Sequence, residues 1–314
     1  MKAYILEGNG IETLKLAELP APEPGQGEVL IKTKAISLNP VDIAMMTVEP
    51  IRNGLYNAVS GEQIIPAWDI AGEVIKVGQD VMDFKAGDKV FGCIKFPGQG
   101  KACAEFVAAP AEHLALIPEG ISFELAAAAT MAAITPYEAL VVKGKLSADD
   151  KVLIHAAAGG VGHFAVQIAK SFGAYVIGTA STANVEFVKS IGADEVIDYK
   201  TSKFEEVVKD ADLVLDSIDA ANLMRSLDAV KTGGRVVSLK ATFDGEIAEK
   251  AASKNVTGIR EGINSSGELI RKIAGLLASG QLKPVVFKTF DFAEFPEAVK
   301  AMDHVGYGKI VIRF

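Results

Sequence analysis

The sequence predicts an α/β protein that combines a doubly wound parallel sheet with a second, β-rich domain. Apolar runs recur from residue 151 onward with helix-like stretches between them, at 151–157, 174–180, 194–199, 212–217 and 235–240. Runs so rich in Val, Ile and Leu are typical of parallel strands that are buried on both faces. Before residue 120, short apolar runs are instead punctuated by Gly and Pro, which indicates a β-rich unit.

The strands of the β-rich unit are predicted at 28–38, 69–78, 88–92 and 103–110, and no long amphipathic helix separates them. A further helix is predicted at 266–280, after a sixth strand of the parallel sheet near 256–260. The tail returns to strand texture in "PVVFKTFDF" and "GKIVIRF", and these strands could belong to either domain.

Composition limits the classes of function. The chain has 314 residues, 49% of them hydrophobic and 23% charged, with a formal net charge of −8. This acidic balance argues against a nucleic-acid partner. The stretch 125–142 is rich in Ala and contains Pro136, so we expect a buried helix that ends before Pro136 and no membrane span. Without a signal-peptide pattern, we expect a cytoplasmic protein in which Cys93 and Cys103 are reduced thiols.

The segment "HAAAGGVGHFAVQIAK" follows the first parallel strand and opens the first helix. Ala157, Gly159 and Gly162 occupy the three small positions of a dinucleotide-binding fingerprint. In that motif the first small residue permits a tight turn, the second lets a pyrophosphate approach the backbone, and the third lets helix and strand pack closely. The amides around Gly160 and Val161 then face the phosphates at the positive end of the helix dipole. Gly173 is predicted to cap this helix.

The second strand indicates which dinucleotide binds. An NAD site places Asp or Glu near its end, whereas this chain has "GTASTAN" there and no acid before Glu186. Hydroxyl and amide groups can donate to a 2′-phosphate, so the segment favours NADP. A nearby Arg or Lys is missing, since Lys189 lies well along the next helix. The alternative is an ordinary Ser/Thr loop with a helix cap at Thr182 or Asn184.

Several motifs together resemble one known family. "SLNPVDIAM", "PAWDIAGEVIKVG", "GDKVFG", "ITPYEAL" and the glycine segment occur in the order found in the medium-chain dehydrogenase/reductase superfamily, in its zinc-independent, zeta-crystallin-like quinone oxidoreductase branch. The resemblance implies a GroES-like catalytic domain formed by residues 1–120 and 285–314, and a Rossmann NADP-binding domain at 121–284. It further implies NADPH as the hydride donor and a homodimer.

Zinc-dependent relatives bind their metal with Cys, a His-Glu pair and a second Cys or an acid. The matching places here hold Asn39, Trp68-Asp69 and Met131. Asn, Trp and Met do not provide the soft or imidazole ligands that a catalytic zinc needs. We therefore expect no zinc.

The resemblance also implies site residues. Asn39 is the first catalytic candidate, because its amide can orient substrate or nicotinamide; the alternative is a turn residue before Pro40. Thr135 matches a position near the nicotinamide, with helix capping or packing as the alternative. Tyr56 is a third catalytic candidate. Besides the glycine segment, the implied cofactor-binding residues are Ser181, Tyr199, Ser217, Ser238, Leu239, Gly308 and Lys309.

Specificity is expected to lie in a substrate-facing loop at 45–65. Its Met45, Met46, Ile51 and Leu55 could form an apolar pocket wall or simply pack. Trp68 could line the cleft or pack in the core.

The sequence thus predicts an NADPH-dependent reductase of quinones or α,β-unsaturated carbonyl compounds that works without a metal. Two alternatives stay open. One is a carbonyl or alcohol oxidoreductase, and the other is a pyridine-nucleotide-binding sensor or structural protein with little catalysis.

Overall fold

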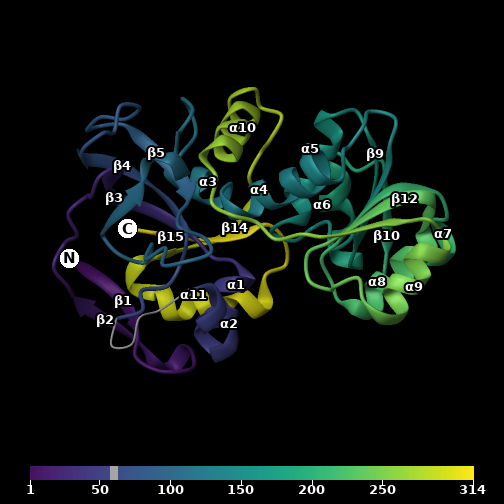
Figure 1. Ribbon diagram of the computed structural model, residues 1–314, viewed down its shortest axis with the longest axis horizontal. Helices are drawn as coiled ribbons and strands as arrows, with labels where there is room; N and C mark the ends of the chain where they lie inside the picture. The colour runs from purple at the N-terminus through teal and green to yellow at the C-terminus, as the bar shows by residue number, and fades with distance from the viewer. Residues whose placement is uncertain (57–62) are drawn as a thin grey trace.

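The computed structural model describes residues 1–56 and 63–314. Two large sheets lie toward opposite ends of the long axis, and both termini lie at the end that holds β3 (Glu28–Ser37) and β4 (Asp69–Val77) (Figure 1). A small antiparallel sheet of β1 (Lys2–Leu6) and β2 (Leu14–Glu18) lies at the same end.

The first large sheet has the strand order β14-β15-β3-β4-β5-β7, and β6 also pairs with β3. Its remaining strands are β5 (Lys89–Cys93), β6 (Phe106–Pro110), β7 (Ala115–Leu116), β14 (Val286–Asp291) and β15 (Lys309–Arg313). The strands predicted in the N-terminal part are all present. The sequence did not show which domain the two tail strands join. In the structure they extend this sheet, because β15 pairs antiparallel with β3. The domain bounds implied above stay a prediction.

The second sheet is parallel throughout and has the order β10-β9-β8-β11-β12-β13. Its strands are β8 (Lys151–Ile154), β9 (Tyr175–Ala180), β10 (Glu195–Asp198), β11 (Ala211–Asp216), β12 (Val230–Ser238) and β13 (Thr257–Arg260). The order reverses between β8 and β11, which creates a crevice at the carboxyl ends of the strands where ligands bind in such folds.

Helices cover both faces of the parallel sheet, which confirms the doubly wound prediction. Val152 and Ile154 of β8 pack with α5 (Gly162–Ser171) and α6 (Val185–Ser190), whereas Leu153 belongs to the opposite cluster. That cluster includes side chains of α7 (Phe204–Val207), α8 (Ala220–Ala229) and α9 (Gly245–Ser253). Gly173 follows α5 with φ 87°, as predicted for a C-terminal cap.

The prediction of a helix that ends before Pro136 is wrong, because Pro136 lies inside α4 (Met131–Tyr137). The Thr135 hydroxyl donates to the Met131 carbonyl at 2.7 Å, and the chain then widens into a π-helical turn over Glu138–Lys143. There the amide of Gly144 donates to Ala139, five residues back. Proline removes a single donor, and the wider turn accommodates the break without ending the helical path.

The remaining α-helices are α1 (Pro40–Thr47), α2 (Glu49–Leu55), α3 (Phe123–Ala128), α10 (Gly267–Ala278) and α11 (Phe295–Ala301). Within residues 1–56 and 63–314, none of the helices has the length and apolar character needed to cross a bilayer.

Candidate active site

A cavity of about 900 Å³, which we call the first cavity, is lined by residues from both halves of the chain. Apolar side chains of α1, α2 and α4 form much of its wall, among them Val41, Leu55 and Met131. The opposite wall is the loop between β8 and α5, together with residues at the ends of β11 and β12. The cavity therefore lies at the crevice of the parallel sheet.

The loop between β8 and α5 carries the predicted fingerprint. Its left-handed residue is Ala156, with φ 49°, and the turn spans residues 155–158, so Ala157 lies within it. Ala157 is fully buried, and its Cβ would lie 2.8 Å from a Cβ added at Gly178 on β9. A Cβ at Gly162 would lie 2.1 Å from the carbonyl oxygen of Ala156. Position 162 therefore requires glycine.

The amides at the start of α5 are available to a ligand. Among the described residues, no backbone hydrogen bond uses the amides of Gly160, Val161 or Gly162, and all three residues line the first cavity. A Cβ at Gly159 would meet the Ala156 carbonyl at 3.3 Å, which leaves less room for a side chain there. Unpaired amides at the N-terminus of this helix form a favourable site for a phosphate.

The structure brings together some of the other predicted cofactor residues. Ser217, Leu239, Gly308 and Lys309 line the first cavity with the glycine loop, and the Gly308 amide donates to the Ala158 carbonyl at 2.9 Å. Ser238 is not a lining residue, because its buried hydroxyl accepts from the Ala241 amide at 3.0 Å. Ser181 also lines neither cavity described here, and its carbonyl accepts from the Asn184 amide in a short 3₁₀ turn.

Asn39 lies in a buried polar group that we call the Asn39 cluster, consisting of Asn39, Asp42, Asp69 and Lys309. The Lys309 ammonium donates to Oδ1 of Asn39 at 2.5 Å and to the Leu38 carbonyl at 2.6 Å. The Asn39 amide nitrogen donates to Asp69 Oδ2 at 2.7 Å. Asp42 caps α1 by accepting from the backbone amide of Asn39 at 2.6 Å, so it supports the turn that carries Asn39.

Burial dominates the electrostatics of the Asn39 cluster. Desolvation raises the pKa of Asp42 to about 7, and the neighbouring Asp69 adds to the rise. Burial likewise raises the pKa of Asp69, against the opposing effect of Lys309. Burial lowers the pKa of the Lys309 ammonium, although Asp69 and Asp42 oppose that change. The raised pKa favours a neutral Asp42 below about pH 7. Burial opposes the charges on Asp69 and Lys309, but Asp69 accepts from two amides and Lys309 donates to two oxygens, as a carboxylate and an ammonium do.

Thr135 lines the first cavity, as predicted, but its hydroxyl donates to its own helix. Tyr56 does not reach the cavity. It is fully buried, and its hydroxyl donates to the Ile65 carbonyl at 2.9 Å and accepts from the Ile65 amide at 3.1 Å. The hypothesis of a catalytic Tyr56 is therefore not supported by its position.

The predicted substrate-facing segment divides into two parts. Ile51 and Leu55 of α2 line the first cavity, whereas Met45 and Met46 are fully buried in the core. Residues 57–62 of this segment lie outside the described residues. Trp68 is also fully buried, and its indole donates to the Gly98 carbonyl at 2.7 Å, so it packs and does not line the cavity.

A second cavity of about 420 Å³ adjoins the same loop, since Ala156 lines both cavities. It lies at the carboxyl ends of β8, β9, β10 and β11, and the predicted Tyr199 is part of its wall. His155 forms another part, with its ring nitrogens 3.2 Å from the Thr179 hydroxyl and 3.0 Å from the Ser226 hydroxyl. Burial lowers the pKa of His155 to about 4, so this ring is neutral near pH 7.

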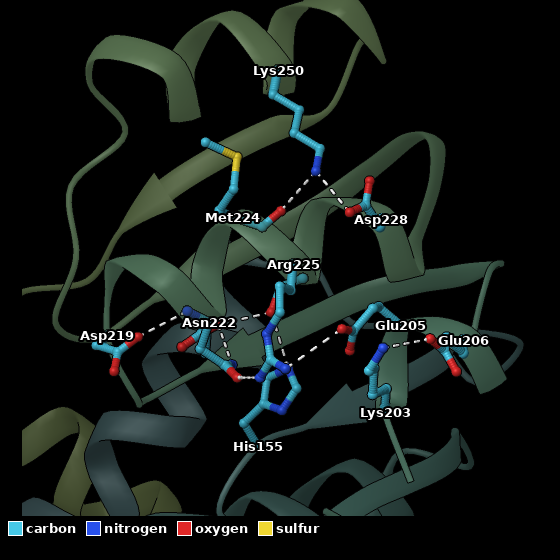
Figure 2. Close-up of polar contacts among 12 residues, drawn as sticks. His155, Lys203, Glu205, Glu206, Asp219, Asn222, Met224, Arg225, Asp228 and Lys250 are labelled. Atoms are coloured by element: carbon cyan, nitrogen blue, oxygen red, sulfur yellow. Dashed lines mark hydrogen bonds and ion pairs between the residues drawn. The ribbon is translucent and has the colours of Figure 1, made fainter.

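Two cations line the second cavity, and the sequence reading missed both. Arg225 of α8 donates to Asn222 Oδ1 at 2.8 Å (Figure 2). Its guanidinium also lies over the Phe204 ring, 4.8 Å from the ring centroid. Lys203 pairs with Glu206 at 2.9 Å at the surface. Both follow the ends of strands in the parallel sheet, and that position is the signal that could have identified them.

Comparisons with known proteins agree with this architecture. The family described as an alcohol dehydrogenase GroES-like domain matches residues 25–119, and the one described as a zinc-binding dehydrogenase matches residues 191–312. A 2-methylene-furan-3-one reductase from Solanum lycopersicum is 35% identical over 99% of this chain and 79% of its own length. An NADPH-dependent alkenal/one oxidoreductase from Arabidopsis thaliana, a chloroplastic protein, is 34% identical with the same shares.

Solved structures agree along the whole chain. A quinone oxidoreductase from Coxiella burnetii has a TM-score of 0.90 and 31% identity, covering 100% of this chain and 99% of its own. A mycobacterial protein solved with NADPH has a TM-score of 0.86 and 26% identity, covering 100% of both chains. From its sequence matches and its fold, the chain belongs to the medium-chain dehydrogenase/reductase superfamily, in the zeta-crystallin-like branch of quinone and alkenal oxidoreductases.

Proposed function

We propose that this oxidoreductase transfers a hydride from NADPH to a quinone or to the β-carbon of an α,β-unsaturated carbonyl compound. The observation that carries this proposal is the first cavity, where a phosphate-binding loop and the Asn39 amide share one apolar chamber. The activities for which the Solanum and Arabidopsis relatives are named support the same substrate class.

The residues of the loop fit a dinucleotide. The close approach at Gly162 and the available amides of Gly160 and Val161 are suited to a pyrophosphate at the start of α5. NADPH, when bound, supplies the hydride. The apolar side chains of α1, α2 and α4 would hold a planar substrate and exclude water from it.

The substrate oxygen needs a donor, because hydride addition to the β-carbon moves the π electrons onto the carbonyl oxygen. A proton from solvent then completes the reduction at the α-carbon of an enone, or at oxygen in a quinone. Asn39 can donate from its amide while that charge develops.

We propose that the reaction proceeds without zinc. The side chains at the matching positions are already engaged or chemically unsuited. Asn39 and the Met131 backbone amide both donate to Asp69, while the Trp68 indole is buried against Gly98. A catalytic zinc is bound by Cys, His or free carboxylate groups, which these residues do not offer.

We propose NADP as the preferred dinucleotide, with its adenosine end in the second cavity. Arg225 and Lys203 supply the cations that a 2′-phosphate needs and that the sequence around residues 178–184 lacks. The hydroxyl of Tyr199 offers a further hydrogen-bonding group.

The function is tested by following NADPH oxidation at 340 nm with purified protein and a panel of quinones, enones, aldehydes and ketones. Turnover of quinones or enones with no dependence on added or chelated zinc is the expected result. Turnover of saturated aldehydes or ketones alone would favour a carbonyl or alcohol oxidoreductase. Tight NADPH binding without turnover of any acceptor would favour a sensor.

A further inference from the structure

Few groups around the first cavity can stabilise negative charge on a bound substrate. Among its described lining residues, Thr135 donates to Met131, and the Ser217 hydroxyl lies 3.4 Å from the His155 carbonyl. Lys240 and Arg260 line the cavity but are exposed to solvent, where charge is screened. Asn39 and Lys309 are the buried donors in this lining set.

The two charged neighbours of Asn39 fix the orientation of its amide. An ammonium can only donate, so Lys309 must meet the amide oxygen, and the carboxylate of Asp69 must meet the amide nitrogen. A flipped amide would place its NH₂ against the ammonium and its oxygen against the carboxylate. Lys309 and Asp69 therefore allow only one orientation of the Asn39 amide.

Each donor carries one more hydrogen than the hydrogen bonds of ordinary length that it makes among the described residues, although the Asn39 side chain also interacts weakly with the Asp42 carboxyl. The amide nitrogen of Asn39 carries two N–H groups and donates one to Asp69. The Lys309 ammonium carries three and donates two, to Leu38 and Asn39. Both residues line the first cavity.

The aliphatic part of Lys309 links this cluster to the nucleotide loop. Its Cδ would lie 3.1 Å from a Cβ at Gly160, and the adjacent Gly308 donates to Ala158 of the same loop. Lys309 thus runs along the loop that would hold the pyrophosphate and ends at Asn39. It fixes Asn39 with respect to that loop.

We infer that Lys309 is a positioning residue, which together with Asp69 fixes the Asn39 amide so that its second N–H donates to the substrate oxygen, and whose positive charge stabilises the anion formed by hydride addition. This inference rests on the proposed function and assigns Lys309 a role other than binding the cofactor. In this arrangement an ammonium supplies the positive charge that a metal ion supplies in zinc-dependent dehydrogenases.

The test compares Lys309→Met, which keeps the aliphatic chain but removes the charge and all three donors, with wild type. We expect kcat for an enone to fall on the order of 100-fold, since one oxyanion donor is worth at least that much, while the Kd for NADPH changes less than about twofold. Lys300→Met on the exposed surface of α11 is the matched control and should leave kcat unchanged.

A double-mutant cycle separates positioning from general structural damage. If Lys309 acts in part through Asn39, the double variant Lys309→Met/Asn39→Ala should lose less kcat than the product of the two single losses. Additive losses, or a kcat for Lys309→Met within twofold of wild type, would overturn the inference. Lys309→Gln, which keeps a donor without the charge, is measured in parallel in case the Met variant does not fold. It should lose at least about tenfold in kcat with NADPH affinity retained.

An equilibrium readout distinguishes this inference from the proposed function. The phenolate of 4-nitrophenol absorbs visible light and imitates the anionic oxygen of the reduced product. Wild type in complex with NADP⁺ should bind the phenolate more tightly than the neutral phenol, and Lys309→Met should lose that preference. Equal preference in both proteins would contradict the role of Lys309, whereas absence of turnover in wild type would contradict only the proposed function.

Discussion

The two cavities that meet at Ala156 use charge in opposite ways. The first cavity has apolar walls, and its buried charges are held with one another in the Asn39 cluster, while Lys240 and Arg260 line it from the solvent side. The second cavity has cations that stay close to solvent, with 48% of the Arg225 side chain and 67% of the Lys203 side chain exposed. A buried, paired charge suits the stabilisation of an anion that exists only briefly. An accessible cation suits a phosphate that must bind and leave.

The largest effect is expected where the two cavities share a wall. Gly162→Ala would place a Cβ 2.1 Å from the Ala156 carbonyl oxygen, so helix α5 and the loop must separate. We expect a loss of roughly 3 kcal/mol in the free energy of unfolding, together with a loss of NADPH affinity. Denaturant unfolding and calorimetric titration measure the two losses.

Gly275→Ala is the matched control, because a Cβ there has no atom within 4 Å and the residue lies inside α10. It should leave NADPH affinity unchanged and stabilise the protein by up to about 1 kcal/mol. Similar behaviour of the two variants would show that the approach of α5 to the loop is not a requirement for binding.

The next effect tests whether an accessible cation of the second cavity binds the 2′-phosphate. Arg225→Ala removes a cation that the proposal assigns to the 2′-phosphate, so the Kd for NADPH should rise about 10- to 100-fold, as expected for a charged hydrogen bond. The Kd for NADH should change little. Lys250→Met is the control, since this lysine binds Asp228 and the Met224 carbonyl nearby without lining the cavity (Figure 2). Equal losses for both dinucleotides would remove Arg225 from phosphate recognition.

Lys203→Met should have a smaller effect, because this more exposed ammonium is also paired with Glu206. We expect about a threefold rise in the Kd for NADPH at low ionic strength. The difference from wild type should vanish near 1 M salt, where the screening length is about 3 Å. A loss that persists at high salt would indicate a desolvated contact instead.

The smallest effect is on the pH dependence of stability. It has opposite signs for Asp42, near the first cavity, and for His155, at the second cavity. The raised pKa of Asp42, about 7, means that its contribution to stability is fully present below its unfolded value near 3.8 and is lost as pH rises through about 7. The lowered pKa of His155, about 4, has the reverse effect, since stability falls as pH drops from about 6.5 toward 4. His163, beside the loop, shares the direction of His155.

Asp42→Asn should therefore gain Tm relative to wild type as pH rises from 5 to 8. For His155→Gln, the loss of Tm relative to wild type should shrink as pH falls from 7 to 5. Thermal unfolding across this range measures both trends. Parallel curves for wild type and Asp42→Asn would mean that Asp42 is ionised in the folded protein throughout.

The sequence predicts the parallel strands and the glycine loop well, but it does not predict which polar side chains meet at the two cavities. Local signals were sufficient for the parallel strands and the glycine loop, because an apolar run, a close approach and a helix start are encoded in neighbouring residues. Asn39 and Thr135, which the resemblance implies as catalytic candidates, both line the first cavity. Within the turn at 155–158 the left-handed φ lies at Ala156, a position that the fingerprint does not single out.

The partners of the polar side chains in and around the two cavities could not be predicted from neighbouring residues in the sequence. Lys309 and Asn39 are 270 positions apart, and only the pairing of β15 with β3 brings them together. Tyr56 has a polar group that suggests chemistry, but the backbone of Ile65 satisfies it inside the core. Arg225 lies on a helix after β11, so its approach to Tyr199 depends on the strand order and not on spacing along the chain.

A crystal structure with NADPH bound tests most directly whether one dinucleotide spans both cavities. The account predicts the pyrophosphate on the amides of Gly160 and Val161, the nicotinamide in the first cavity beside Thr135, and the 2′-phosphate within hydrogen-bonding distance of Arg225. A nicotinamide outside the first cavity, or a 2′-phosphate that contacts neither Arg225 nor Lys203, would contradict it.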